Sequence, residues 1–242
     1  VQEAAAKAIS SAAYNHPANQ RLFVEGGCIQ LLAAQLRWGP GPAQLEAART
    51  LCNVMCTDGS RELLMAEEGV LPVLVELMRS SVQSLREVPA TIIGNLASDH
   101  ANRTRLAAAG CVAPLIEQVR SGSAQGKKWA TLALMALAEG SHGIKTQLAE
   151  AGAIPALVAL GKSGEPQAVV LASKALGALT SGHTGNQELV RRHEGAAALE
   201  RLAQMGGLKI TSLSAEQAAG LRGATAGSDP AAGQAEEDSR AT

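Results

Sequence analysis

The side chains in this sequence that could hold a metal ion or act as nucleophiles are four cysteines and five histidines. Cys52 and Cys56 lie four residues apart, so on a helix they would share one face and could form half of a metal site. No matching second pair exists, because Cys28 and Cys111 stand alone. Cysteine is also a common small residue of protein cores. We therefore expect four reduced thiols inside apolar helices, no bound metal, and a cytoplasmic or nuclear protein.

Four histidines recur at the junctions between one predicted helix and the next, namely His16, His100, His142 and His183. They stand beside residues that commonly cap helices, such as Asp99 and Ser141, and the segment from Thr184 to Gln187 has the spacing of a capping box. Packed helices lie about 10 Å apart, whereas each ligand of a zinc ion must lie about 2 Å from the metal. One ion cannot gather these histidines, so their recurrence predicts helix caps and turns.

Signatures of catalysis and of other common functions are missing from the sequence. The patterns Gly-x-Gly-x-x-Gly, His-Glu-x-x-His and Gly-x-Ser-x-Gly and the phosphate-binding P-loop do not occur. Acidic residues are spread along polar faces, with no cluster that suggests a general acid and base. The net charge of −1 differs from the strongly basic charge that is typical of nucleic-acid-binding proteins. No apolar run reaches the roughly 18 residues that are needed to span a bilayer. We expect a protein that is not an enzyme, has no cofactor, and binds neither nucleic acid nor membrane.

One apolar segment that contains a glycine occurs five times in the sequence. This repeat predicts the helices that would position any functional site. Its cleanest copy is 150–160 (EAGAIPALVAL), and the others are 25–36, 67–77, 108–119 and a worn copy at 194–202. The anchor glycines recur at intervals of 41 to 43 residues and are Gly27, Gly69, Gly110, Gly152 and Gly195. A nearly constant interval of this size is typical of a helical repeat array rather than of one globular core.

Each unit contains three predicted helices. A short first helix leads into the glycine, at 17–24, 60–66, 101–108, 142–150 and 185–192. A second helix follows, with Pro72, Pro114 or Pro155 in its first turn, where proline is tolerated. The third helices align on positions 11, 53, 95, 136 and 178. Apolar residues then stand two places before these positions (Ile9, Leu51, Ile93, Leu134, Leu176) and one place after them (Ala12, Val54, Leu96, Leu137, Leu179). These pairs predict a buried seam, and small residues five and six places before let adjacent layers approach closely.

Three helices per repeat of about 42 residues, with Glu-Ala-Gly-Ala-Ile-Pro-Ala-Leu at the turn, resemble the armadillo repeat family. The resemblance covers roughly residues 2–224. It implies an all-α fold, a right-handed α-solenoid whose third helices line a concave groove that binds extended peptides or protein segments. We divide the array into a partial repeat at 1–14, repeats at 15–56, 57–98, 99–139 and 140–181, and a worn repeat at 182–224. Residues 225–242 lack large apolar side chains and predict a disordered tail.

The resemblance also indicates which residues would line the groove. Armadillo proteins that carry nuclear-import signals have a Trp on the third helix, four residues before an Asn. Here Asn53 and Asn95 occupy the Asn place in two repeats, and no Trp occupies the Trp place, so the import pattern is not matched. The residues at the Trp place are Lys7, Arg49, Thr91, Leu132 and Lys174. The two asparagines could hold a partner's backbone, since an amide both donates and accepts hydrogen bonds, or they could simply be solvated.

Two further features of the groove leave alternatives open. The basic residues Lys7, Arg49 and Lys174, with Lys127 and Lys128, would favour an acidic or phosphorylated segment. Scattered solvated charge explains them equally well. Trp129 stands near the predicted groove and could be a binding anchor or could pack over the preceding loop, and we expect Trp38, beside Gly39, to pack against its loop.

Two functions fit these observations. The first is a non-catalytic scaffold or adaptor that binds an extended protein segment along the groove. The second is a substrate-recognition or regulatory segment of a larger multidomain enzyme, such as a ubiquitin ligase. The helix at 2–14 has an apolar stripe but no preceding partner. We expect this end to fray or self-associate unless upstream residues cover it.

Overall fold

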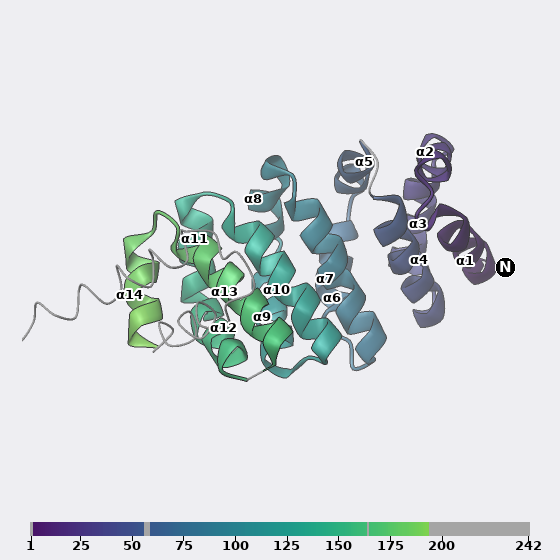
Figure 1. Ribbon diagram of the computed structural model, residues 1–242. Helices are drawn as coiled ribbons and strands as arrows, with labels where there is room; N and C mark the ends of the chain where they lie inside the picture. The colour runs from purple at the N-terminus through teal and green to yellow at the C-terminus, as the bar shows by residue number, and fades with distance from the viewer. Residues whose placement is uncertain (1, 56–58, 164, 194–242) are drawn as a thin grey trace, which may run out of the picture.

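The computed structural model describes residues 2–55, 59–163 and 165–193. These residues form fourteen helices, α1 to α14, stacked in successive layers (Figure 1). The worn repeat beyond residue 193, its glycine Gly195, the predicted tail and Cys56 lie outside the described residues. None of the described helices combines the length and the apolar character that crossing a membrane requires.

The third helices of the repeats lie side by side across the molecule, each packed on the next (Figure 1). They are α1 (Gln2–Ala13), α4 (Gly41–Val54), α7 (Gln83–Ala97), α10 (Ala124–Ala138) and α13 (Pro166–Thr180). The second helices are α3 (Cys28–Trp38), α6 (Val70–Leu77), α9 (Val112–Ser121) and α12 (Ala153–Lys162). The first helices are α2 (Pro17–Glu25), α5 (Ser60–Ala66), α8 (His100–Ala108), α11 (His142–Glu150) and α14 (Thr184–Arg192). Three helices per repeat are therefore confirmed in the four repeats that the structure describes in full, α2–α4, α5–α7, α8–α10 and α11–α13.

The anchor glycines make the sharp turn between first and second helices. Gly27, Gly69, Gly110 and Gly152 have φ values of 79°, 78°, 85° and 90°. A side chain with a Cβ is strained in this left-handed region, whereas glycine adopts it freely. The regular interval of these glycines thus reflects one backbone conformation that recurs in each described layer.

The predicted seam forms the core of the inner layers. Leu51, Ile93, Leu134 and Leu176 are at most 1% exposed, and their partners Val54, Leu96, Leu137 and Leu179 are fully buried. Helix α1 differs, because it lies at the end of the stack: Ile9 is half-buried, Ala12 is exposed, and Ala6 and Ala13 are buried instead. The seam is therefore confirmed for α4, α7, α10 and α13 and wrong for Ala12.

Side chains of the first helices donate hydrogen bonds to backbone carbonyl groups at the carboxyl ends of the preceding third helices. The donors and their carbonyl acceptors are Asn19 to Ala12 (2.8 Å), Gln20 to Ala13 (2.9 Å), Asn102 to Leu96 (3.3 Å), Arg103 to Ala97 (2.8 Å), Asn186 to Leu179 (3.0 Å) and Gln187 to Thr180 (3.1 Å). The last turn of a helix leaves carbonyl groups without intrahelical partners. These bonds satisfy them and fix the corner between layers.

The capping role predicted for the histidines is confirmed for His16 and His183. The Nδ1 atoms of His16 and His183 accept hydrogen bonds from the backbone N–H groups of Asn19 and Asn186, both at 3.2 Å. His100 and His142 begin their helices after the caps Asp99 and Ser141, whose side chains accept backbone hydrogen bonds. The capping box at Thr184 was wrong by one residue, because the imidazole of His183 takes the cap position.

The cysteine side chains and Trp38 differ in how well the structure agrees with the sequence-based predictions. Cys28 and Cys111 are buried free thiols, as expected, and Cys52 is half-buried. Trp38 does not pack against its loop: it is 78% exposed, with the Arg37 guanidinium 4.9 Å from the ring centre. The prediction for Trp38 was therefore wrong.

Candidate functional site

The face formed by α1, α4, α7, α10 and α13, called here the third-helix face, carries all eight residues predicted for the groove. Lys7, Arg49 and Lys174 are exposed on it, and the others are half-buried. Four of the eight come together in a single cleft between α7 and α10, namely Thr91, Asn95, Trp129 and Leu132. Lys7, Arg49 and Asn53 belong to earlier layers and Lys174 to a later one, so they do not line this cleft.

The α7–α10 cleft has a volume of about 300 Å³ and mixed chemistry. Its apolar surface comes mainly from Trp129, Leu132 and Met135 of α10. Thr91 and Asn95, one helical turn apart on α7, supply polar groups on the other side. Gly94 also lines the cleft, and a Cβ at this position would lie 3.6 Å from the Cα atom of Ala133, so the glycine lets α7 and α10 approach closely. Such a cleft can bury an apolar side chain while hydrogen-bonding the chain that carries it.

The two asparagines are in different states. Asn53 Nδ2 donates to the carbonyl oxygen of Ser10 (3.3 Å) and to its Oγ (3.0 Å), so this amide joins α4 to α1. Asn95 makes no side-chain hydrogen bond within the described chain, and it lines the open cleft. A free carboxamide offers a carbonyl acceptor and two N–H donors. Asn95 is therefore the better placed of the two to bind a partner's peptide backbone.

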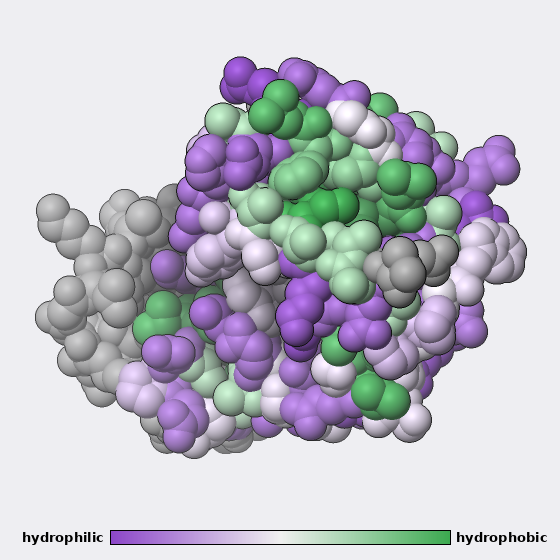
Figure 2. Space-filling view, turned by 90° about the vertical axis from the view of Figure 1, so that its right-hand side faces the viewer, coloured by the Kyte–Doolittle hydropathy of each residue, from purple (hydrophilic) through white to green (hydrophobic). Residues whose placement is uncertain are grey.

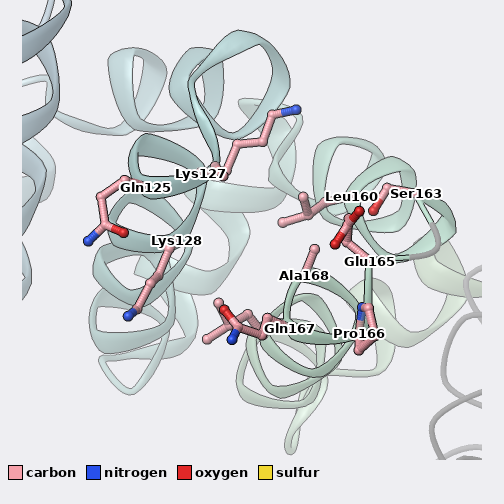
Figure 3. Close-up of a pocket in the computed structure, with 11 residues that line it drawn as sticks. Gln125, Lys127, Lys128, Leu160, Ser163, Glu165, Pro166, Gln167 and Ala168 are labelled. Carbon is pink, nitrogen blue, oxygen red and sulfur yellow. The ribbon is translucent and has the colours of Figure 1, made fainter.

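A second cleft, of about 700 Å³, lies between α10 and α13. Figure 3 shows Gln125, Lys127 and Lys128 of α10 on one side, and Ser163, Glu165 and Gln167 on the other. Leu160 and Ala168 lie between these groups. No ion pair joins Lys127 or Lys128 to Glu165 in the part of the chain that the structure describes. Both lysines are half-buried and line the cleft.

Helix α10 links the two clefts. Lys128 lines the α10–α13 cleft, and its Nζ lies 5.0 Å from the centre of the Trp129 ring, which lines the α7–α10 cleft. This cation–π contact is expected to hold both side chains in place. A chain lying across α7, α10 and α13 would therefore meet the mixed α7–α10 cleft first and the partly basic α10–α13 cleft next.

The basic residues of the other layers differ in whether they are paired. Arg49 makes an ion pair with Glu46 on the same helix at 3.0 Å, although its side chain is 51% exposed. An exposed pair of this kind contributes only about 0–1 kcal/mol, so a partner's carboxylate could compete for Arg49. Lys7 and Lys174 have no ion pair within the described residues.

Among the described residues no group of three or more His, Cys, Asp or Glu side chains could hold a metal ion. The described groups with shifted pKa values lie away from both clefts. Burial raises the pKa of Cys28 to about 11 and that of Cys111 to about 12, and it lowers the pKa of Lys145. Hydrogen bonds from Arg191 and then Arg192 lower the pKa of Glu188. Lys145 uses its ammonium to bind the Ser181 carbonyl at 2.6 Å, so its role is structural.

Sequence reasoning missed the walls of the larger cleft. It noted Lys127 and Lys128, but not Gln125, Glu165 or Gln167. Gln125 and Gln167 stand 42 residues apart at the start of successive third helices. Equal spacing of polar residues at those helix starts is the signal that could have identified them.

Comparison with models of known protein families gave no match, and comparison with curated protein sequences gave none either. Solved structures of designed proteins are similar in fold. Designed armadillo repeat protein YIII(Dq)4CqI superimposes with a TM-score of 0.82 at 21% identity, over 90% of this chain and 92% of that one. Designed protein YIII(Dq.V1)4CPAF, in complex with the peptide (KR)4, gives a TM-score of 0.79 at 22% identity, over 90% and 91%. Computationally designed armadillo repeat proteins for modular peptide recognition give 0.80 at 21% identity, over 90% and 92%. The described helices and these likenesses agree: the chain has the armadillo repeat fold, a right-handed α-solenoid with three helices in each layer.

Proposed function

We propose that this protein is a non-catalytic scaffold or adaptor whose third-helix face binds an extended segment of another protein. The observation that carries the proposal is the α7–α10 cleft, where the unpaired amide of Asn95 lies beside Trp129 and Leu132. An extended chain presents backbone groups at regular intervals and side chains on alternate sides. Asn95 would bind the backbone, and one apolar side chain of the segment would enter the cleft against Trp129.

The charges on the face favour an acidic segment. Lys127 and Lys128 stand at the α10–α13 cleft, and Lys7 and Lys174 are exposed in other layers. Acidic groups on the face, such as Glu46, Glu87 and Glu139, limit this preference. The similar designed protein that holds a (KR)4 peptide binds a basic ligand, so the sign of the ligand charge is a point on which this chain is proposed to differ.

A second candidate function is recognition of substrates or regulators for a larger enzyme, such as a ubiquitin ligase. The same face would bind the segment, and the catalytic part would lie elsewhere in the polypeptide. Purification of the native protein from its cells, followed by mass spectrometry of the intact chain and of its bound proteins, separates the two functions. A polypeptide that also contains a catalytic domain would favour the second function.

The binding proposal is tested by selecting ligands from a random-peptide display library on the immobilised protein. We expect enriched peptides that combine acidic residues with one large apolar residue, and that bind more weakly to Asn95→Ala and Trp129→Ala. Matched controls are Gln30→Ala and Trp38→Ala, because Gln30 and Trp38 are exposed side chains outside the third-helix face. Peptides that bind all four variants equally would show that the third-helix face is not the binding site.

A further inference from the structure

The α10–α13 cleft is the larger of the two clefts on the third-helix face, and its walls are more basic than acidic. The charged side chains that line it, among the described residues, are Lys127, Lys128 and Glu165. Both lysines are half-buried, whereas Glu165 is exposed. Figure 3 shows the two lysines across the open space from Ala168. The cleft therefore holds two partly desolvated cations and one acid that water can reach.

The preceding junction, between α7 and α10, shows how the chain fills the equivalent place. There the side chain of Glu87 lies over Gly126, with atoms 3.0 to 3.1 Å from the point that a Cβ on this glycine would occupy. The amide nitrogen of Gln83 donates to the Glu87 carboxylate at 3.1 Å. Gln118 of α9 donates to the Arg86 carbonyl of α7 beside it. A carboxylate and an amide of the chain itself thus occupy this end of the α7–α10 junction.

The α10–α13 junction carries different residues at the equivalent positions. Lys128 stands at the position of Glu87, because each of them precedes its aligned position, 136 or 95, by eight residues. Leu160 stands at the position of Gln118, since each follows its anchor glycine by eight residues. Among the described residues, this junction thus has a lysine where its neighbour has a carboxylate. It stays open, with a volume of about 700 Å³.

These surroundings suit an anionic side chain. A lysine ammonium offers three hydrogen-bond donors and no acceptor, so two of them match the oxygen atoms of a carboxylate or a phosphate. A basic side chain would be repelled, and an apolar one would cover the half-buried ammonium groups without replacing their hydrogen bonds to water. Leu160, Ala168 and Leu171 provide an apolar wall for the carbon atoms of the incoming side chain. An acidic or phosphorylated residue therefore fits the cleft best.

The two clefts lie at different heights on α10, which sets the spacing of a segment that uses both. Residues between Trp129 and Glu139 line the α7–α10 cleft, and residues between Ala124 and Lys128 line the α10–α13 cleft. The midpoints of these stretches are about eight residues apart, or about 12 Å along the helix axis. The clefts lie on opposite flanks of α10, and packed helices are about 10 Å apart. Together these distances give roughly 15 Å, which an extended chain covers with about four or five residues.

We propose that the segment bound on the third-helix face carries an anionic side chain about four or five residues from its apolar anchor, and that the α10–α13 cleft binds this group through Lys127 and Lys128. The inference rests on the proposed function, since the apolar anchor is the side chain that enters the α7–α10 cleft beside Asn95 and Trp129. It adds a second subsite and a defined separation between two residues of the ligand.

The probe is a peptide from the display library that binds Asn95→Ala more weakly than the wild type, because such a peptide uses the α7–α10 cleft. Synthetic versions place a single glutamate at each other position in turn, and calorimetry measures their affinities. We expect the tightest binding at a separation of about four or five residues from the apolar anchor. Glutamine at that position should weaken binding about fivefold. Phosphoserine there distinguishes the two sources of charge, because tighter binding than glutamate assigns a phosphate and weaker binding assigns a carboxylate.

A double-mutant cycle locates the bound anion. Lys127→Gln should remove most of the difference between the glutamate and glutamine peptides, and it leaves the contact between Lys128 and Trp129 in place. Arg79→Gln, which removes an exposed cation outside both clefts, should leave the difference unchanged. The end of the stack in Figure 2 also exposes hydrophobic residues, Leu31 among them, to which an apolar peptide can adhere. Leu31→Glu is therefore a second control, and it should bind the peptide as the wild type does.

The outcomes separate this inference from the proposed function. An affinity that does not depend on the position of the acid, or a difference that Lys127→Gln leaves intact, would overturn the anion subsite while binding beside Asn95 stands. If no selected peptide loses affinity for Asn95→Ala, or if Leu31→Glu abolishes binding, the proposed function fails and the anion subsite fails with it.

Discussion

Replacement of Arg103 by alanine should destabilise the protein more than any other single change at a charged residue of α8. Arg103 is 8% exposed and joins two layers. Its Nε donates to the Ala97 carbonyl and its Nη1 to the Glu139 carbonyl, both at 2.8 Å. These acceptors belong to the carboxyl ends of α7 and α10. The cation therefore also opposes the partial negative charge at two helix ends.

The magnitude follows from these contacts. A hydrogen bond that involves a charged group contributes about 1.5–3 kcal/mol to the free energy of unfolding. The ion pair between Arg103 and the Glu139 carboxylate, at 3.3 Å, adds little, because the Glu139 side chain is 58% exposed and such pairs give about 0–1 kcal/mol. In the alanine variant, water can hydrogen-bond in part to the two carbonyl groups that Arg103 no longer contacts. Taking the lower value for each of the two carbonyl bonds gives an expected loss of about 3 kcal/mol.

Urea denaturation followed by circular dichroism measures this loss, and hydrogen exchange shows where it occurs. We expect faster exchange at the carboxyl ends of α7 and α10, since stability in a repeat array is largely local. The matched control is Arg105→Ala on the same helix, which removes one hydrogen bond to the Met65 carbonyl from an exposed residue and should cost about 1 kcal/mol. Equal losses for the two variants, or a loss below about 1 kcal/mol for Arg103→Ala, would refute the assigned role.

Three other predictions concern the core, the thiols and metal binding. Leu134→Ala on the central seam should cost about 2–5 kcal/mol in denaturant unfolding, and a loss below about 1 kcal/mol would mean that the assigned seam is wrong. Burial raises the pKa of Cys111 to about 12; this thiol stays neutral in the folded state while it ionises in the unfolded state, so stability present below about pH 8.5 is lost as pH rises toward 12. Melting temperature should therefore fall with alkaline pH more steeply in the wild type than in Cys111→Ala, and parallel curves would contradict the shift. EDTA should leave the melting temperature unchanged, because the described histidines and cysteines have no common centre; a clear drop, with stoichiometric zinc in the protein, would reverse that view.

The layered fold could be predicted because the same sequence pattern occurs in every repeat, so each occurrence supports the same structural assignment. A single Gly27 or Leu51 says little, but their recurrence at nearly equal intervals specifies one backbone turn and one buried position several times over. The same argument predicted the capping histidines as a group. It failed for Thr184, because two adjacent residues could both cap α14 and the imidazole of His183 was the better placed acceptor.

The site could be predicted only where it follows the repeat. Residues spaced four apart lie on one face of a helix, so the sequence predicts which residues share the third-helix face. It does not predict which hydrogen-bond partner each of these side chains has. Asn53 and Asn95 occupy equivalent positions, yet Ser10 in the neighbouring layer engages Asn53 and no described residue engages Asn95. Trp38 was misjudged because its exposure depends on its place at the end of the stack, where no described helix covers it.

Binding of a partner segment to the third-helix face can be tested directly, because the protein's two tryptophans lie at different sites. Trp129 lies in the α7–α10 cleft and Trp38 at the end of the stack. In a ¹H–¹⁵N NMR titration of the intact protein with a peptide selected from the display library, Trp129→Phe and Trp38→Phe assign the two indole N–H signals. We expect the Trp129 indole and the Asn95 side-chain amide to shift together and saturate, while the Trp38 indole stays in place. Shifts confined to Trp38, or to residues of the first and second helices, would contradict binding on the third-helix face.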